Sequence, residues 1–342
     1  MKYTLCKNFS EINPQEWNDL LSSSITDTPF LRYEYQSTWW DNLGGSEWSR
    51  QNAELILVTA REDEKLVGVA PLFISEYEGK PALLLIGSIE ISDYLDLIVR
   101  SEDHARFVTG LLNFLASDEL PNPRRWSGLD WYNLPDSSPT LAVLKSESAQ
   151  RGWTHLEEIY RPTPRIALNG SFEQYLSQVE KKQRHEIRRK MRRAEESGRN
   201  VRWYISDMQD VEAEIENFLS LMEHDEGKAA FLQEEMREQM RAIIRTAHEH
   251  GWLWLAFLEA DNQRIAACLN FDYKNKLWGY NAGVNRDFME LSPGWVLLGL
   301  TLQWACENNR SEFDFMRGDE EYKYRFGAVN QYVMRVQLMR DL

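Results

Sequence analysis

The chain has 342 residues, which is long enough for two domains of ordinary size that each bury a core of their own. It is 43% hydrophobic and 27% charged, as globular proteins are, and its apolar runs, such as residues 83–86 and 295–302, are too short to span a bilayer. The formal net charge of −15 makes the molecule as a whole repel polyanions, which disfavours nucleic acid as a partner.

Three widely spaced cysteines, Cys6, Cys268 and Cys306, have no CxxC or His-rich companion, so we predict neither a disulfide framework nor a metal site. Cys268 alternates with apolar neighbours, which predicts a core thiol. The first 17 residues contain no apolar run of signal-peptide length, so we expect a cytoplasmic protein without a membrane span. Nothing in the sequence indicates the oligomeric state.

A weak internal repeat organises the chain. Residues 57–73 read LVTAREDEKLVGVAPLF and residues 256–272 read AFLEADNQRIAACLNFD, and each pattern predicts a β-hairpin around a polar turn. Each hairpin is followed by a strand-like run (82–87; 277–283) and then by an amphipathic helix (105–116; 295–308). A unit of this size used twice predicts a duplicated domain, since the period of a solenoid is much shorter.

The predicted boundary lies at residues 161–164, which read RPTP, or at the Asn169-Gly170 turn just after them. We therefore predict one domain over residues 1–168 and a second over 169–342, with the last strand, 332–340, packing on the first domain. Beyond the boundary the pattern indicates a strand at 201–205 and helices at 211–224 and 234–250. Hairpins mixed with crossovers predict an α/β fold with a mixed sheet.

One long helix is predicted over residues 171–198, where Ser171 and Gln174 form a capping box and Gly198 ends the pattern. One face of this helix is strongly basic. Two interpretations stay open: a solvated face of an amphipathic helix, or a binding surface for a phosphate-bearing or polyanionic ligand. The second interpretation rests on Arg184, Arg188 and Arg189.

The densest cluster of ionisable and phenolic groups is FDFMRGDEEYKYRFG, residues 313–327. A strand over 313–317 breaks at Gly318, after which Asp319 is placed to cap a short helix that carries Tyr322 and Lys323. These residues are either a catalytic cluster at a strand end or a helix cap with a local ion pair between Asp319 and Lys323. His224, with Asp225 and Glu226 beside it, is interpreted either as a general base near the acceptor or, as we favour, as an exposed helix end.

These patterns resemble the tandem GNAT acetyltransferase architecture of the Fem-type transferases and of the CelD-type acetyltransferase-domain proteins. The resemblance covers nearly the whole chain, and its most specific carrier is the motif FDFMRGDEEYK (313–323). The other carriers are individually weak: TPF (28–30), WW (39–40), DYLD (93–96), KKQRHEIRRK (181–190), AA (266–267) and SPG (292–294). The resemblance implies that the second half is catalytic and that the first half is its degenerate twin.

The resemblance also implies a site. The acyl donor would lie between strands 277–283 and 312–317, and its pyrophosphate would dock where a helix begins at Ser292, Gly294 and Trp295. Asp319, Tyr322 and Lys323 would be catalytic, with Tyr280 as the reserve proton donor; Arg317 and the three arginines of the basic helix would help to hold the donor. No metal is implied. The usual Gln/Arg-x-x-Gly-x-Gly/Ala loop is absent.

Three functions follow from these observations. The first is an acyltransferase that moves an acyl group from acyl-coenzyme A to an amine of a small molecule or glycan, such as an amino sugar or a precursor in polysaccharide biosynthesis. The second is a Fem-type transferase that uses aminoacyl-tRNA, which would make tRNA the one nucleic acid partner. The third is a non-catalytic scaffold that binds glycans or anions. Trp252, Trp254 and Trp278 lie in strand patterns and are predicted to be core rather than sugar-stacking residues.

Overall fold

The computed structural model describes residues 1–45, 53–77, 80–117 and 126–340. The chain forms two compact units, of which the first comprises Met1–Pro162 with Tyr332–Leu342 and the second comprises Thr163–Gln331. Strands β7 (Thr154–Ala167) and β13 (Val329–Met339) each begin in one unit and end in the other. The prolines at residues 162 and 164 therefore lie inside a strand and do not interrupt it.

The first unit is built on a mixed sheet in the order β1-β2-β3-β4-β6-β13. Neighbouring strands are antiparallel except β4 and β6, which are parallel. Its elements are β1 (Lys2–Cys6), η1 (Phe9–Glu11), α1 (Pro14–Leu21), η2 (Pro29–Leu31), α2 (Tyr33–Leu43), β2 (Glu54–Glu62), β3 (Lys65–Tyr77), β4 (Lys80–Leu85), β5 (Ile98–Val99), α3 (His104–Ala116), β6 (Gly128–Pro135) and α4 (Pro139–Arg151).

A buried carboxylate ties the first unit together. Asp96 is fully buried, and its two oxygens accept hydrogen bonds from the hydroxyls of Thr26, Ser138 and Thr140 at 2.6–2.7 Å. The backbone N–H of Leu97 donates to the same carboxylate at 2.8 Å. A charge taken out of water is tolerated only when it is satisfied in this way, so the last position of the DYLD motif has a structural role here.

The second unit repeats this strand order as β8-β9-β10-β11-β12, and β12 then pairs with the end of β7. Again one pair inside the sheet, β11 with β12, is parallel. Its elements are α5 (Phe172–Gln178), α6 (Lys181–Glu195), β8 (Arg202–Ile205), α7 (Val211–Met222), α8 (Glu226–Phe231), α9 (Glu234–Glu249), β9 (Leu253–Ala260), β10 (Gln263–Tyr273), β11 (Lys276–Val284), η4 (Arg286–Leu291), α10 (Pro293–Glu307), β12 (Glu312–Asp314) and α11 (Glu321–Arg325).

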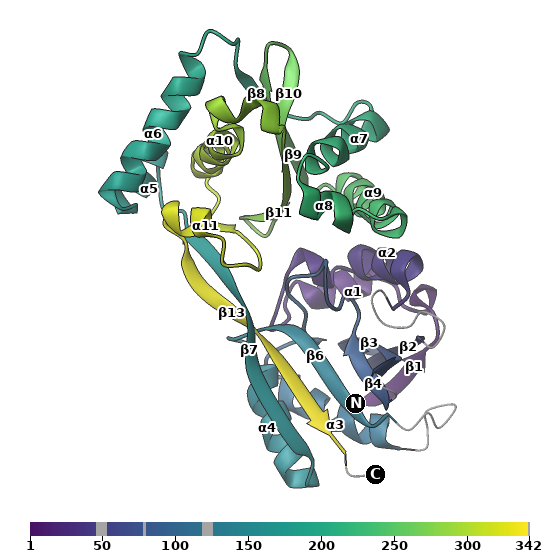
Figure 1. The fold of residues 1–342 in the computed structure, drawn as a ribbon. Coiled ribbons are helices and arrows are strands. Elements are labelled where there is room, and N and C mark those ends of the chain that lie inside the picture. The colour runs from purple at the N-terminus through teal and green to yellow at the C-terminus, as the bar shows by residue number, and fades with distance from the viewer. Residues whose placement is uncertain (46–52, 78–79, 118–125, 341–342) are drawn as a thin grey trace. The chain divides into compact units, whose positions relative to one another are not determined.

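Two hydrophobic cores flank the sheet of the second unit, since alternate strand residues face opposite sides. Helices α5, α6 and α10 cover one face, and α7 and α9 cover the other (Figure 1). Helix α7 approaches β11 at Gly283, where a Cβ would come within 2.4 Å of the Leu221 carbonyl carbon, so a side chain there would push the helix off the sheet. The strand tryptophans Trp252, Trp254 and Trp278 are core residues, as predicted.

The structure corrects two predicted elements. The helix predicted over 171–198 is two helices, because Val179 and Glu180 adopt extended backbone angles between α5 and α6 and Val179 is buried in the core. The strand predicted over 313–317 ends at Asp314, because Met316 has a φ of 59° and its N–H donates to the Asp314 carboxylate. The capping box of Ser171 and Gln174 is present as predicted.

Candidate active site

The two parallel strands of the second unit separate part-way along their length. Strands β11 and β12 pair at only three positions, from Lys276 with Glu312 to Trp278 with Asp314. Strand β11 continues to Val284, whereas the chain after β12 follows β7 instead, where the Phe315 N–H donates to the Pro164 carbonyl at 3.0 Å. The side of β11 that faced β12 therefore loses that ladder partner beyond Trp278.

The pairing of β11 with β10 is also irregular at this place. The register passes from Gly279 opposite Asn270 to Asn281 opposite Leu269, which leaves Tyr280 at a β-bulge. Bulges twist a strand and redirect its side chains, and they are frequent beside active sites. The ring of Tyr280 lies 4.6 Å from that of Phe271 and packs against the core on the α7 side of the sheet.

Helix α10 begins beside the end of β11. A Cβ at Gly294 would lie 3.1 Å from Val284, so the first turn of the helix contacts the last residue of the strand. Ser292 stands at the N-cap with a φ of 52°, its side chain does not cap the helix, and Pro293 contributes no N–H. The first N–H groups of a helix have no intrahelical acceptor, and the indole N–H of Trp295 is buried without a hydrogen-bond partner among the described residues. This end of α10 therefore offers donors to an anion.

The loop after β12 is held by a buried lysine. The ammonium of Lys323 has three acceptors: the carbonyl of Arg317 at 2.8 Å, the carbonyl of Gly318 at 3.3 Å and the carboxylate of Glu320 at 2.8 Å. The exposed fraction of the Lys323 side chain is only 3%. Lys323 therefore binds the loop to the start of α11, and the local ion pair predicted with Asp319 forms with Glu320 instead.

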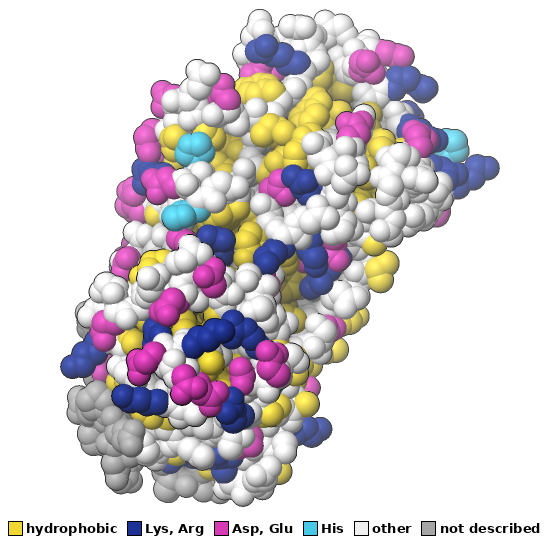
Figure 2. All heavy atoms as spheres, turned by 180° about the vertical axis from the view of Figure 1, so that it is seen from behind, with side chains coloured by type: hydrophobic (Ala, Val, Ile, Leu, Met, Phe, Trp, Pro, Cys, Tyr) yellow, Lys and Arg dark blue, Asp and Glu magenta, His cyan; other side chains and the backbone are white. Residues whose placement is uncertain are grey.

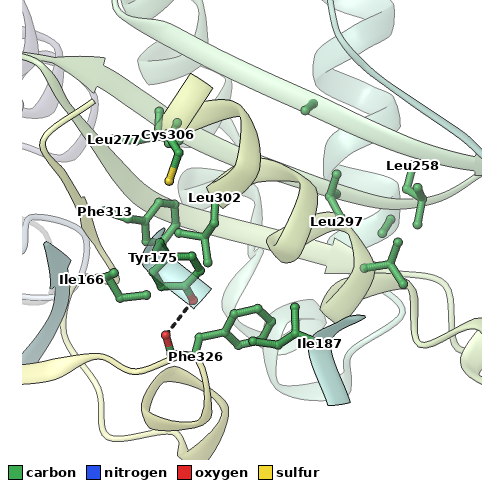
Figure 3. Close-up of a cluster of buried hydrophobic side chains, with 14 of the residues drawn as sticks. Ile166, Tyr175, Ile187, Leu258, Leu277, Leu297, Leu302, Cys306, Phe313 and Phe326 are labelled. Atoms are coloured by element: carbon green, nitrogen blue, oxygen red, sulfur yellow. Dashed lines mark hydrogen bonds between the residues drawn. The ribbon is translucent and has the colours of Figure 1, made fainter. Parts of the chain in front are cut away.

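The other end of α11 is fixed by the core beneath it. The hydroxyl of Tyr175 donates to the carbonyl of Phe326 at 2.7 Å, within a cluster that includes Phe313 and Ile187 (Figure 3). The ring of Phe326 lies 4.7 Å from that of Trp295. Helix α11 is thus attached to the first turn of α10, which brings Tyr322 and Lys323 into the same region as the predicted donor site.

Asp319 and Tyr322 occupy exposed positions on this loop and helix. Asp319 precedes the N-cap position of α11, which Glu320 occupies without a side-chain cap, and within the described residues it forms neither a hydrogen bond nor an ion pair. Tyr322 is 43% exposed, and its ring packs edge-on against Phe315 at 6.0 Å. Desolvation and then the carboxylate of Glu320 raise the pKa of the Tyr322 phenol above its ordinary value, so this group keeps its proton at neutral pH.

The basic residues of α6 serve more than one purpose. Arg184 donates to the carbonyls of Leu176 and Ser177 and so closes the C-terminal end of α5. Arg188 pairs with Glu173, and Arg189 pairs with Glu186 through two 2.8 Å bonds. On the face drawn in Figure 2, basic and acidic side chains are interspersed in the same way.

Further along, α6 borders a surface groove of about 460 Å³ that leads to the start of α10. The groove is lined by Arg189, Arg192, Arg193, Glu196, Ser197, Arg199, Glu290 and Leu291, and Leu291 directly precedes Ser292. The ammonium of Lys190, which directly follows Arg189 on α6, lies 4.1 Å from the centre of the Trp295 ring. Of the three arginines predicted for the donor, only Arg189 lines this groove.

Sequence reasoning missed two residues of this region. Lys228 on α8 donates a hydrogen bond to the carbonyl of Ala282, in the part of β11 that has left β12. Glu320 lies close enough to affect the charge states of both Lys228 and Tyr322. The pattern gave no sign of α8, because its six residues lie between two longer predicted helices. The predicted exposed helix end is the N-cap of α8, where Asp225 accepts from two backbone N–H groups.

Residues 181–324 match the family model of the acetyltransferase (GNAT) domain. This part of the chain is similar to the GNAT acetyltransferase domain. The match includes α6, both separated strands, the start of α10 and most of α11. The match supports a transferase. A search of curated protein sequences found no significant match.

Solved structures share the fold of the whole chain. FemX aligns with a TM-score of 0.68 at 13% identity, covering 98% of this chain and 97% of that one. L-PGS from Bacillus licheniformis aligns with a TM-score of 0.58 at 10% identity, covering 96% and 92%. A tandem GNAT protein from the clavulanic acid biosynthesis pathway aligns with a TM-score of 0.51 at 11% identity, covering 98% and 97%. The predicted mixed α/β fold and the predicted tandem GNAT, Fem-like architecture are confirmed.

Two searches of the described residues complete the site. No helix among them is long and apolar enough to cross a membrane, and they contain no group of three or more His, Cys, Asp or Glu side chains able to hold a metal ion. Cys268, predicted as a core thiol, is partly buried against the core, and burial raises the pKa of its thiol to about 11.

Proposed function

We propose that this protein is an N-acyltransferase that moves an acyl group from acyl-coenzyme A to the amine of an amino sugar or another precursor of cell-envelope polysaccharide. The observation that carries the proposal is the separation of β11 from β12 inside a GNAT domain. Backbone groups of β11 beyond Trp278 have lost β12 as a ladder partner, and they would meet the carbonyl of a thioester and stabilise the negative charge that develops on its oxygen.

The region next to the separated strands suits the phosphates of the donor. The first turn of α10 carries no acidic side chain, its N-cap side chain makes no cap, and the indole N–H of Trp295 has no hydrogen-bond partner in the described part of the chain. The adjoining groove supplies Arg189, Arg192 and Arg193, and guanidinium groups pair well with phosphate oxygens. Ser292, Gly294 and Trp295 would hold the pyrophosphate, with Arg317 near the acyl end and Arg184 and Arg188 supporting α6.

The exposed groups on α11 and its loop would act on the acceptor and the leaving group. We assign Tyr322 as the proton donor to the departing thiolate, because its phenol stays protonated, and Tyr280 at the bulge as the reserve donor. Asp319 would orient the acceptor amine through its exposed carboxylate. Lys323 is better described as a positioning residue, since its three N–H groups already have acceptors within the loop.

The test is transfer from acetyl-coenzyme A to glucosamine, followed by thiol release and by mass spectrometry of the product. Tyr322→Phe and Asp319→Asn should each lower the rate by about 100-fold while the melting temperature stays the same. Tyr324→Phe is the matched control, because Tyr324 lies on the same helix and is also exposed. Full activity of both variants would refute these roles, and transfer from aminoacyl-tRNA alone would replace the proposed donor.

A further inference from the structure

Lys228 is the one lysine described in the second unit whose ammonium reaches the separated part of β11. It lies on α8, is half-buried, and donates to the Ala282 carbonyl, two residues before the strand ends at Val284. Among the described residues it makes no ion pair within 4 Å. A half-buried ammonium that donates to a single backbone carbonyl has two further N–H groups for another partner.

The charged groups around Lys228 are already committed to other partners. Asp225, at the N-cap of α8, pairs with Arg286 of η4 at 2.8 Å, and Glu320, from the loop before α11, pairs with Lys323 at 2.8 Å. Desolvation therefore dominates and lowers the pKa of Lys228, while the more distant charges of Asp225 and Glu320 raise it to a smaller extent. A larger share of Lys228 is consequently neutral near pH 8 than for a lysine in water.

The position of Lys228 matters because the amine that attacks a thioester must lose a proton. Helix α8 lies on the α7 side of the sheet, and its lysine and the Glu320 loop both approach the same separated stretch of β11. An acceptor amine that reaches a donor carbonyl held by β11 would meet the Lys228 amine there. The carboxylate of Asp319, by contrast, is exposed on the loop before α11.

We propose that Lys228 is the catalytic base of this site and that it accepts the proton of the attacking amine, an inference that rests on the proposed function. The acceptor nitrogen forms a bond to the carbonyl carbon, whose π electrons move to oxygen, and the neutral Lys228 Nζ takes one N–H proton. When the carbonyl re-forms, the carbon–sulfur bond breaks and the thiolate takes the proton of Tyr322. Lys228 then releases its proton to solvent and Tyr322 regains one, so the products are an amide and a thiol.

The first test does not require a substrate. The full chain is labelled with trace acetic anhydride over pH 6–11, and acetylation of each lysine is followed by mass spectrometry, because only the neutral amine reacts. The exposed Lys181 and Lys182 serve as references in the same digest. Lys228 should reach half-maximal reactivity at a lower pH than these references, and Glu320→Gln should move it lower still. The proposal is wrong if Lys228 titrates with the references or stays unlabelled at pH 11.

The second test uses transfer from acetyl-coenzyme A to glucosamine. Lys228→Arg keeps the charge and can donate to Ala282, but a guanidinium cannot accept a proton, so it should lose about 100-fold in kcat/KM, as Lys228→Met should. In the wild-type protein kcat/KM should rise with pH through the titration seen by labelling. Retained activity of Lys228→Arg would overturn the base role. If the wild-type protein transfers nothing, the proposed function fails, and the labelling result alone decides whether Lys228 has the required property.

Discussion

Replacing Lys323 with methionine should destabilise the second unit. Methionine keeps much of the buried apolar stem but removes the ammonium, which donates to the carbonyls of Arg317 and Gly318. Hydrogen bonds from a charged donor are worth about 1.5–3 kcal/mol each, and the 3.3 Å bond to Gly318 counts for less. The pair with Glu320, whose side chain is 57% exposed, adds at most about 1 kcal/mol. The expected loss in the free energy of unfolding is therefore about 2–4 kcal/mol.

Differential scanning calorimetry measures this loss directly. A domain of this size loses about 2–4 °C in melting temperature per kcal/mol, so the Lys323→Met transition should fall by about 5–15 °C. Glu320→Gln is the matched control, because it removes the ion pair and leaves both carbonyl contacts, and it should shift the transition by less than half as much. Hydrogen exchange at residues 315–320 should speed up only in Lys323→Met. An unchanged melting temperature would refute the positioning role of Lys323.

Three further predictions concern other groups. Asp96→Ala leaves three buried hydroxyls and one N–H without their acceptor and should cost about 3–5 kcal/mol in urea unfolding; a loss below 1 kcal/mol would show that water replaces the carboxylate. Burial lowers the pKa of His104 below 6.5, so the unfolded chain takes up the proton at a higher pH than the folded chain does. The free energy of unfolding should therefore decline as pH falls below 6.5. His104→Gln should flatten that decline, and an unaltered slope would exclude His104 as its source. Reversing both Arg188 and Arg189 to Glu should weaken coenzyme A binding in titration calorimetry, yet it should change the free energy of unfolding by about 1 kcal/mol or less. The same charge reversal at Lys181 and Lys182 is the control. Equal weakening by both pairs would mean a general charge effect.

The parts of this fold that the sequence predicts well are those with strong local signals. The hairpin predicted at 256–272 is β9 and β10, and the helix predicted at 295–308 is α10, because period-2 and apolar patterns mark them. The break after α5 escaped detection because Val179 continues the helical apolar spacing while its backbone is extended to place the side chain in the core. Tertiary packing overrides periodicity there.

The candidate site was only partly predictable for a related reason. The cluster at residues 319–323 is contiguous, so the sequence shows its composition, but the choice of Glu320 over Asp319 as the partner of Lys323 depends on backbone angles around Gly318. Lys228 is 92 positions from Glu320 in the chain (320 − 228) and reaches Ala282 only through the packing of α8. No local pattern records such a contact, because it arises from how the elements pack and not from spacing along the chain.

The most direct test of the account is hydrogen exchange of the full chain with and without acetyl-coenzyme A. If the donor lies where β11 leaves β12 and where α10 begins, the amides of residues 279–284 and 294–296 should exchange more slowly when it is bound, and those of β8 and β9 should not change. Protection confined to other elements, or none at saturating acetyl-coenzyme A, would contradict the proposed donor site.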